Sequence, residues 1–327
     1  MRALHRAYKT VHKLLFLVAR ISVACYRNVM SAMSENTRGA ILMILGMAGF
    51  TFGDACIKAI GEALPLSQIL VIRGVFACLF IAILSRALGA IRLDLPRRDW
   101  FLVALRGLAE TGAAVFFLTA LRHMPLANAT SLLQMMPLAV TLGSALVFRE
   151  AVGWRRWIAI AVGFCGMLLI IRPGAEGFNI YSAYALLAVL CVTVRDLSTR
   201  RMSPAVPSLM VTLTSGLTVL AFAGIWSLAQ DWQPVTMRLG LLLSGSTIFI
   251  ILGYACSVMV MRVGEVSFVA PFRYTGLIWA LILGFVLFGD WPHPLTLLGA
   301  AIITMTGIFT LWRESVLRRR QANRARS

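Results

Sequence analysis

Residues 267–288 have the sequence SFVAPFRYTGLIWALILGFVLF, in which Arg273 is the one charged side chain. The hydrocarbon core of a bilayer is about 30 Å thick, so a helix needs about 20 mostly apolar residues to cross it. Nine further runs of this kind lie at residues 40–60, 67–88, 100–121, 125–147, 154–171, 180–199, 206–228, 238–261 and 294–312. The sequence therefore predicts an all-α polytopic membrane protein with ten transmembrane helices.

The composition argues against a soluble protein. Hydrophobic residues make up 59% of the chain, charged residues 13%, and the mean hydropathy is +0.83, whereas soluble domains carry about 25% charged residues. The formal net charge is +18, but the basic residues stand in short clusters between the apolar runs and at both ends. That placement is typical of topology signals in a membrane and not of a groove that holds phosphates. We therefore expect a lipid bilayer as partner, and no nucleic acid.

The distribution of Lys and Arg predicts the orientation. The richer set of connections holds Arg86, Arg92, Arg97, Arg98, Arg149, Arg155, Arg156, Arg195, Arg200, Arg201 and Arg262, and the poorer set holds Lys58, Arg122, Arg172 and Arg238. The richer set shares its side with the basic amino-terminal segment and with a basic tail at residues 314–327. Because basic connections stay in the cytoplasm, we expect a multi-pass protein of the inner (plasma) membrane with both termini cytoplasmic.

Residues 1–38 form a separate basic segment with a short apolar patch at residues 14–19. That patch is too short to cross a bilayer. Apolar residues recur at helical spacing over residues 11–21, which is typical of a basic helix lying on the membrane surface. The alternative is that translation begins at Met30 or Met33 and that most of the segment is not made.

The two halves of the chain resemble each other. The residues that align, at offsets of 140 or 142, are Asp54 with Asp196, Lys58 with Arg200, Pro65 with Pro207, Arg122 with Arg262 and Phe148 with Phe288. Residues 39–174 and 175–313 then hold five spans each, and an odd number makes the second half enter the membrane from the opposite side. We expect two inverted five-helix repeats with a substrate site near mid-membrane between them.

Five side chains within the spans are candidates for binding a substrate, namely Arg73, Glu110, Arg273, Tyr274 and Trp279. A charge at the bilayer centre costs about 2.5–3.5 kcal/mol on insertion scales, so such charges usually face a cavity or a partner. The guanidinium groups offer planar donors to an anionic or carbonyl-rich substrate. The aromatic rings can stack on a ring of the solute, and Glu110 is a candidate for a coupling proton. The alternative is that the charges neutralise one another and orient the helices.

Other charged residues favour a structural role. Arg106 lies one helical turn before the glutamate in the third span, so the two share a face and can pair. The same spacing recurs in two further pairs close to the ends of their spans, Asp54 with Lys58 and Asp196 with Arg200. Long side chains at these places easily reach the interface between membrane and water. We interpret both as pairs that neutralise their charges within one helix.

Proline and glycine mark special places in the helices. Pro137 is predicted to interrupt the fourth span and Pro271 the ninth, because proline frees backbone groups inside a helix. Gly49 and Gly53 form a G-x-x-x-G pattern in the first span, which predicts close packing against another helix.

The sequence contains no recognised catalytic or ATP-binding motif. It lacks G-x-x-x-x-G-K-[ST], H-E-x-x-H and G-x-S-x-G,. The six cysteines form no C-x-x-C pair and the four histidines are scattered, so neither a metal nor a cofactor is expected. We expect a secondary carrier and not an enzyme, and a membrane-embedded transferase is the rival from another class.

Several motifs resemble EamA-type members of the drug/metabolite transporter superfamily. They are IRG at 72–74, PLANA at 125–129, FRE at 148–150, GFCGMLL at 163–169, GEVS at 264–267 and FGDWP at 288–292. The resemblance covers residues 36–315, and LRGL at 105–108 and APFRY at 270–274 are similar to the branch of S-adenosylmethionine uptake carriers, with riboflavin carriers nearby. It implies alternating-access transport of a small polar metabolite that is cofactor-like or nucleotide-like. Export of amino acids or toxic metabolites is the alternative, and a coupling ion and a homodimer stay open.

Overall fold

The computed structural model describes residues 34–87, 89, 94–149, 153–171, 179–203, 205–260 and 266–324. Within these residues ten helical spans are long and apolar enough to cross a membrane, so the predicted all-α polytopic fold is confirmed. The elements are α2 (Glu35–Ile60), α3 (Leu66–Ala87), α4 (Arg97–His123), α5 (Leu126–Leu133), α6 (Met136–Phe148), α7 (Trp154–Ile171), α8 (Ile180–Arg201), α9 (Ser208–Ser227), α10 (Met237–Val260), α11 (Val266–Val269), η1 (Ala270–Tyr274), α12 (Thr275–Phe288) and α13 (Pro294–Arg324). The two alternatives for the amino-terminal segment concern residues that lie outside this range, as do Arg92, Arg172 and Arg262.

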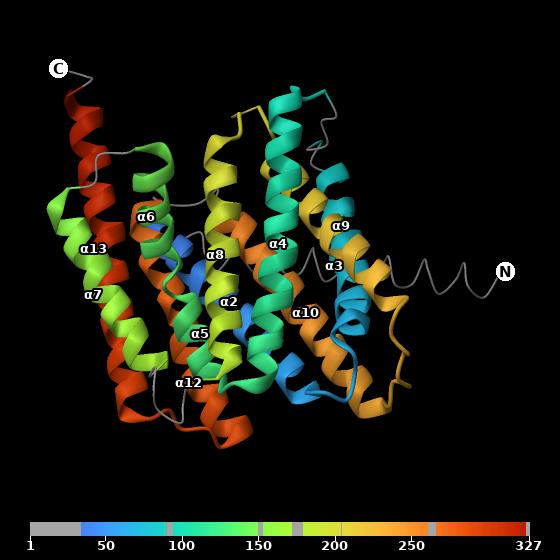
Figure 1. The fold of residues 1–327 in the computed structure, drawn as a ribbon. Helices are drawn as coiled ribbons and strands as arrows, with labels where there is room; N and C mark the ends of the chain where they lie inside the picture. The colour runs from blue at the N-terminus through green and yellow to red at the C-terminus, as the bar shows by residue number, and fades with distance from the viewer. Residues whose placement is uncertain are drawn as a thin grey trace.

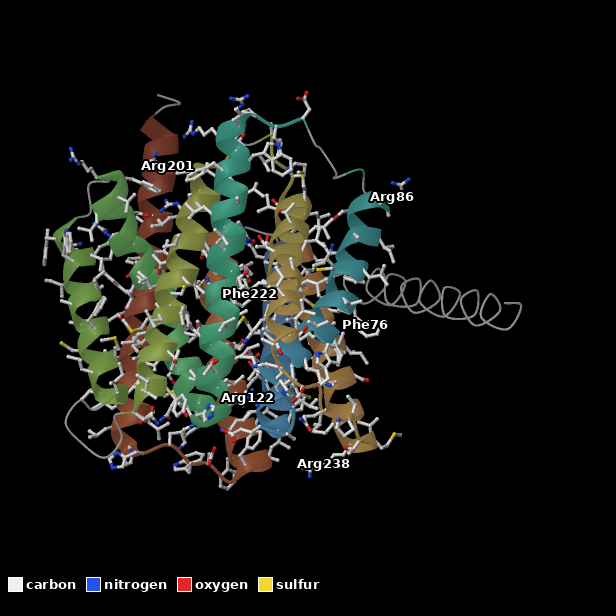
Figure 2. All side chains as sticks on the ribbon, turned by 45° about the vertical axis from the view of Figure 1, so that its right-hand side comes forward. Phe76, Arg86, Arg122, Arg201, Phe222 and Arg238 are labelled. Atoms are coloured by element: carbon white, nitrogen blue, oxygen red, sulfur yellow. The ribbon has the colours of Figure 1, made fainter. Side chains whose placement is uncertain are left out.

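The spans stand side by side and alternate in direction through the bundle (Figure 1). Arg86 and Arg201 lie toward one end of the bundle, and Arg122 and Arg238 lie toward the other (Figure 2). Phe76 and Phe222, between these two ends, expose 54% and 45% of their surface. An exposed apolar belt between two basic rims is the arrangement expected of a protein whose sides are solvated by lipid.

Helices of the first half pack mainly against helices of the second half. The most extensive contacts join α2 to α10, α4 to α8, α7 to α13 and α3 to α9. Where α2 meets α10, a Cβ atom added to Gly49 would lie 2.9 Å from the carbonyl oxygen of Phe249. Gly166 and Gly299 make an equally close approach between α7 and α13. The close packing predicted at the first glycine pattern is confirmed, because a missing side chain lets two backbones meet.

Two of the ten spans are interrupted, the fourth near its middle and the ninth near its beginning. The fourth consists of α5 and α6, which are separated at Gln134 and Met135, and Pro137 lies in the first turn of α6. In the ninth, the 3₁₀-helix η1 separates α11 from α12 and contains Pro271 in its first turn. Proline has no backbone N–H and its ring clashes with the preceding turn. Both predicted interruptions are therefore confirmed.

Corresponding helix ends recur at a nearly constant interval along the chain. α9 begins 142 residues after α3, and α10 and α13 begin 140 residues after α4 and α7. α6 and α12 end 140 residues apart, and the residues that follow them, Arg149 and Gly289, have left-handed backbones with φ of 52° and 67°. Glycine adopts this conformation readily, whereas a residue with a side chain rarely does. Both helices thus stop in the same way.

Candidate functional site

Helices α4 and α8 bring four charged side chains together inside the bundle. On α4, Nη1 of Arg106 lies 3.5 Å from Oε2 of Glu110. On α8, Nη1 of Arg195 lies 3.4 Å from the same oxygen, and its Nε donates to Oδ1 of Asp196 at 2.8 Å. The predicted pair between Arg106 and Glu110 is confirmed. Glu110 is also shared with a guanidinium group of the second half, so it connects the two halves.

Met136 links this group to Arg273. The sulfur atom of Met136 lies 3.8 Å from Nη2 of Arg195 and 3.8 Å from Nη2 of Arg273. Met136 is the first residue of α6 and Arg273 lies in η1, so the contact joins the two interrupted spans. The side-chain amide of Gln134 adds a second link, because its Nε2 donates to the backbone oxygen of Arg273 at 3.2 Å.

Tyr254 of α10 lies between these residues and a further pair. Arg73 of α3 interacts electrostatically with Asp54 of α2 and with Tyr254, and Tyr254 also interacts with Glu110 and Arg195. Nη1 of Arg73 is buried and has no hydrogen-bond partner in the part of the chain that the structure describes. We call seven charged residues the central charged cluster: Asp54, Arg73, Arg106, Glu110, Arg195, Asp196 and Arg273. It contains four guanidinium groups and three carboxyl groups from both halves.

Tyr274 and Trp279, the two predicted aromatic residues of the site, are placed differently from each other. Tyr274 is buried against the backbone of Gly307 in α13, and its hydroxyl group lacks a hydrogen-bond partner among the described residues. It interacts electrostatically with Arg273, so it adjoins the central charged cluster. Trp279 packs on Phe52 of α2 with ring centroids 6.0 Å apart, and it belongs to an aromatic contact outside the cluster.

Comparison with known proteins shows which transporters the chain resembles. Residues 37–172 match the model of the EamA-like transporter family. A riboflavin transporter of Vibrio cholerae is 29% identical over 300 residues, which are 90% of this chain and 99% of that protein. An S-adenosylmethionine uptake transporter of Rickettsia bellii is 26% identical over 276 residues, which are 83% of this chain and 92% of that protein. Residues 37–172 thus carry an EamA-like transporter domain, and the chain is similar over most of its length to proteins named as transporters of riboflavin and S-adenosylmethionine.

The chain also resembles a carrier named as an exporter. The pseudopaline exporter CntI of Pseudomonas aeruginosa is 26% identical over 278 residues, which are 83% of this chain and 94% of that protein. A crystal structure matches with a TM-score of 0.58 and 17% identity, over 86% of this chain and 98% of that chain, which shows a shared fold. The alignments with these relatives therefore cover both halves of the chain, whereas the match to the family model covers the first half.

Sequence reasoning missed Arg195, although the structure places it beside two carboxylates. It is counted above with the basic residues of a connection, which is wrong because α8 continues to Arg201. The adjacent Asp196 is the signal that could have pointed to Arg195. Two opposite charges side by side inside an apolar run indicate that this part of the helix faces a polar interior of the bundle. Arg106 is predicted as a partner of Glu110 but not as a site residue.

The predicted pairing of Asp54 with Lys58 is also wrong. Nζ of Lys58 donates to the backbone oxygen of Met124 at 2.5 Å and lies 3.8 Å from Oδ2 of Asp290. The long lysine side chain therefore reaches past its own helix and joins the ends of α4 and α12 to α2. In the second half, Asp196 accepts from the arginine next to it in the chain.

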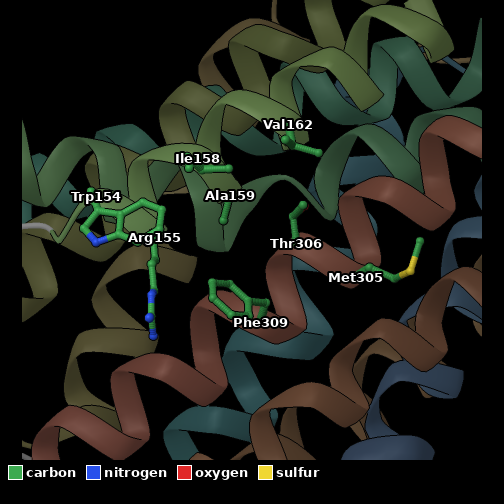
Figure 3. Close-up of a pocket in the computed structure, with 8 residues that line it drawn as sticks. All are labelled: Trp154, Arg155, Ile158, Ala159, Val162, Met305, Thr306 and Phe309. Atoms are coloured by element: carbon green, nitrogen blue, oxygen red, sulfur yellow. The ribbon is translucent and has the colours of Figure 1, made fainter.

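Two surface hollows lie away from the central charged cluster. A polar pocket of about 560 Å³ at the rim of Arg122 is lined by Glu62, Ala63, Leu64, Pro65, Arg122, Gln230, Asp231 and Gln233. An apolar groove of about 400 Å³ between α7 and α13 is lined by Trp154, Arg155, Ile158, Ala159, Val162, Met305, Thr306 and Phe309 (Figure 3). Neither hollow is lined by a residue of the cluster. The groove is lined mostly by apolar side chains, with Arg155 and Thr306 as its polar residues.

Proposed function

We propose that this chain is an EamA-type transporter that moves a small polar metabolite across the inner (plasma) membrane by alternating access. The observation that carries the proposal is the central charged cluster. Glu110 stands near the middle of the 27 residues of α4, and its partners come from both halves. Charges at this depth are costly and usually mark the path of a substrate or ion. In secondary carriers, such sites lie between the two repeats.

The helix bounds support a two-repeat mechanism. They agree with a division into residues 39–174 and 175–313, in which α2 corresponds to α8 and α4 corresponds to α10. Under that correspondence, the contact between α2 and α10 is the counterpart of the contact between α4 and α8. The two interrupted spans are counterparts as well. Rocking of one repeat against the other about the cluster then exposes it to each side of the membrane in turn.

The solute is cofactor-like or nucleotide-like, and S-adenosylmethionine and riboflavin are the leading candidates. Relatives named for these two solutes align over most of the chain. The guanidinium groups of Arg73 and Arg273 can bind a carboxylate, which S-adenosylmethionine carries, or ring carbonyl groups, which riboflavin carries. Tyr274 supplies aromatic surface beside Arg273, whereas Trp279 packs on Phe52 outside the cluster. Glu110 is the group proposed to respond to a coupling proton.

The orientation proposed from the sequence fits the positions of the basic residues. Arg86 and Arg201 share one end of the bundle (Figure 2), and the carboxyl end of α13 lies at that end as well (Figure 1). By the positive-inside rule, this rim faces the cytoplasm and both termini lie there.

Export of an amino-acid-like or toxic metabolite is the second candidate function. The observation that favours it is the likeness to the pseudopaline exporter CntI over 83% of this chain. Uptake and export differ in the direction of the driving gradient, so one measurement in both directions separates them.

The test uses the purified full chain in sealed vesicles with labelled S-adenosylmethionine, riboflavin or an amino-acid mixture. We expect one solute to be accumulated or released chemically unaltered, faster than in protein-free vesicles. Arg273→Ala should abolish this flux, whereas Arg238→Ala, at an exposed position on the rim, should retain it. A product altered by the protein would make the chain a membrane enzyme, and flux that survives in folded Arg273→Ala protein would refute the site.

A further inference from the structure

Arg273 shares its anionic neighbour with another arginine, because Asp196, with which it interacts electrostatically, accepts a hydrogen bond from Arg195. In the described part of the chain, no carboxylate lies within ion-pair distance of its guanidinium group, whereas Arg195 contacts both Glu110 and Asp196. The guanidinium group of Arg273 instead contacts the sulfur atom of Met136 at 3.8 Å. A thioether is a weak acceptor, and an ionised group inside a bundle is costly unless it is paired. Arg273 therefore has unused capacity for an anion.

Two guanidinium groups converge on that one sulfur atom. Nη2 of Arg195 and Nη2 of Arg273 are each 3.8 Å from Sδ of Met136, so these nitrogens are at most twice that distance apart. A guanidinium nitrogen and an anionic oxygen pair at about 2.8 Å. Two oxygens of one carboxylate or phosphate group therefore fit between the two nitrogens once the sulfur moves aside.

Met136 is suited to such a movement. Its side chain is unbranched and has three rotatable bonds, so it changes conformation at low cost. It begins α6 directly after the interruption of the fourth span, where the backbone is not held on both sides by a regular helix. Arg273 is held in place by contrast, because Gln134 binds its backbone oxygen at 3.2 Å.

We propose that Arg195 and Arg273 form an anion subsite that binds a carboxylate or phosphate group of the transported solute, with the thioether of Met136 occupying the subsite in its absence. This inference rests on the proposed transport function for the identity of the ligand. It assigns the substrate to the class of anion-bearing solutes and assigns Arg195, which sequence reasoning missed, to substrate binding. The existence of the subsite itself is independent of any particular solute.

The first experiment tests the subsite without a substrate. The Met136→Glu variant places a tethered carboxylate between the two guanidinium groups, and Met136→Gln is its uncharged match. In thermal unfolding of the purified full chain in detergent, we expect Met136→Glu to melt about 3 °C or more above Met136→Gln. In the Arg273→Gln background this difference should shrink by at least half. If Met136→Glu melts at or below Met136→Gln, the subsite does not exist.

The second experiment tests the ligand class by equilibrium binding. The probes are S-adenosylmethionine against its decarboxylated analogue, and riboflavin 5′-phosphate against riboflavin, and each pair differs in one anionic group. We expect the anionic member of at least one pair to bind about 10-fold more tightly or better, and we expect Arg273→Gln to remove that preference. The exposed Arg238→Gln variant should keep it.

The two experiments separate the possible failures. Met136→Glu could stabilise the chain while the probes that bind show no preference for their anionic member. That result would overturn the assignment of the substrate to anion-bearing solutes. If none of the four probes binds, we repeat the comparison with acetate and inorganic phosphate, which should raise the melting temperature of the unaltered chain but not of Arg273→Gln. If acetate and phosphate do not raise the melting temperature, the subsite is refuted. If they do, the subsite is supported and the cofactor-like solutes of the proposed function are refuted.

Discussion

The side chain of Gln134 donates a hydrogen bond from Nε2 to the backbone oxygen of Arg273 at 3.2 Å. Gln134 stands at the interruption between α5 and α6, and Arg273 lies in η1. The interrupted fourth span thus supplies a donor to a backbone oxygen of the interrupted ninth span inside the bundle, where water does not replace a missing partner,. The bond also fixes the backbone from which the Arg273 side chain extends toward the central charged cluster.

Replacing Gln134 with Leu should weaken this link between the interrupted spans. Gln134 is 5% exposed, so the substitution leaves the backbone oxygen of Arg273 without this donor, and we expect a loss of about 1–3 kcal/mol in unfolding free energy. Thermal unfolding in detergent measures it. Gln233→Leu is the control, because Gln233 is exposed and its backbone atoms make the hydrogen bonds to Gln68. Equal melting temperatures for the two variants would contradict the prediction.

Glu110→Gln should destabilise the bundle and stop transport. The substitution removes the carboxylate that lies within 3.5 Å of Arg106 and 3.4 Å of Arg195. Because the Glu110 side chain is 23% exposed, we expect the free energy of unfolding to fall by about 2 kcal/mol, which is less than the loss for a fully buried pair. Denaturant unfolding and vesicle flux report the two effects.

The matched control for Glu110→Gln is Glu62→Gln. Glu62 pairs with His123 at 2.9 Å but is 77% exposed, so the same chemical change should cost no more than about 1 kcal/mol. Similar losses at both positions would show that Glu110 is not specially placed.

Gly49→Ala should separate α2 from α10. The added Cβ would lie 2.9 Å from the carbonyl oxygen of Phe249, so one helix must shift, and we expect a destabilisation of about 1–3 kcal/mol. Gly224→Ala, inside α9, meets no atom within 4 Å and should be neutral or slightly stabilising. Comparison of the melting temperatures of the two variants checks the prediction, which fails if Gly49→Ala is as stable as Gly224→Ala.

Cysteine labelling should show that the two rims lie on opposite sides of the membrane. In a background without native cysteines, Asp231→Cys should react with a membrane-impermeant thiol reagent in intact cells. Arg98→Cys should react only after permeabilisation, because it lies on the rim proposed to face the cytoplasm. Both positions are exposed. Labelling of Arg98→Cys alone in intact cells would invert the proposed orientation.

The sequence by itself determined the ten spans, their interruptions at Pro137 and Pro271, and the pair between Arg106 and Glu110. These features are local. A chain in lipid must close its backbone hydrogen bonds within each helix, so length and hydropathy define every span, and residues one turn apart share a face.

The tertiary structure alone decided which charges meet across the bundle. Arg195 is 85 residues from Glu110 in the chain, and Arg273 is 137 residues from Met136. Apolar spans of similar composition give no signal of which helices are neighbours, and that choice depends on how side chains and glycine backbones fit together. Lys58 shows the same limit, because its long side chain passes the acid on its own helix and reaches Asp290 on another element.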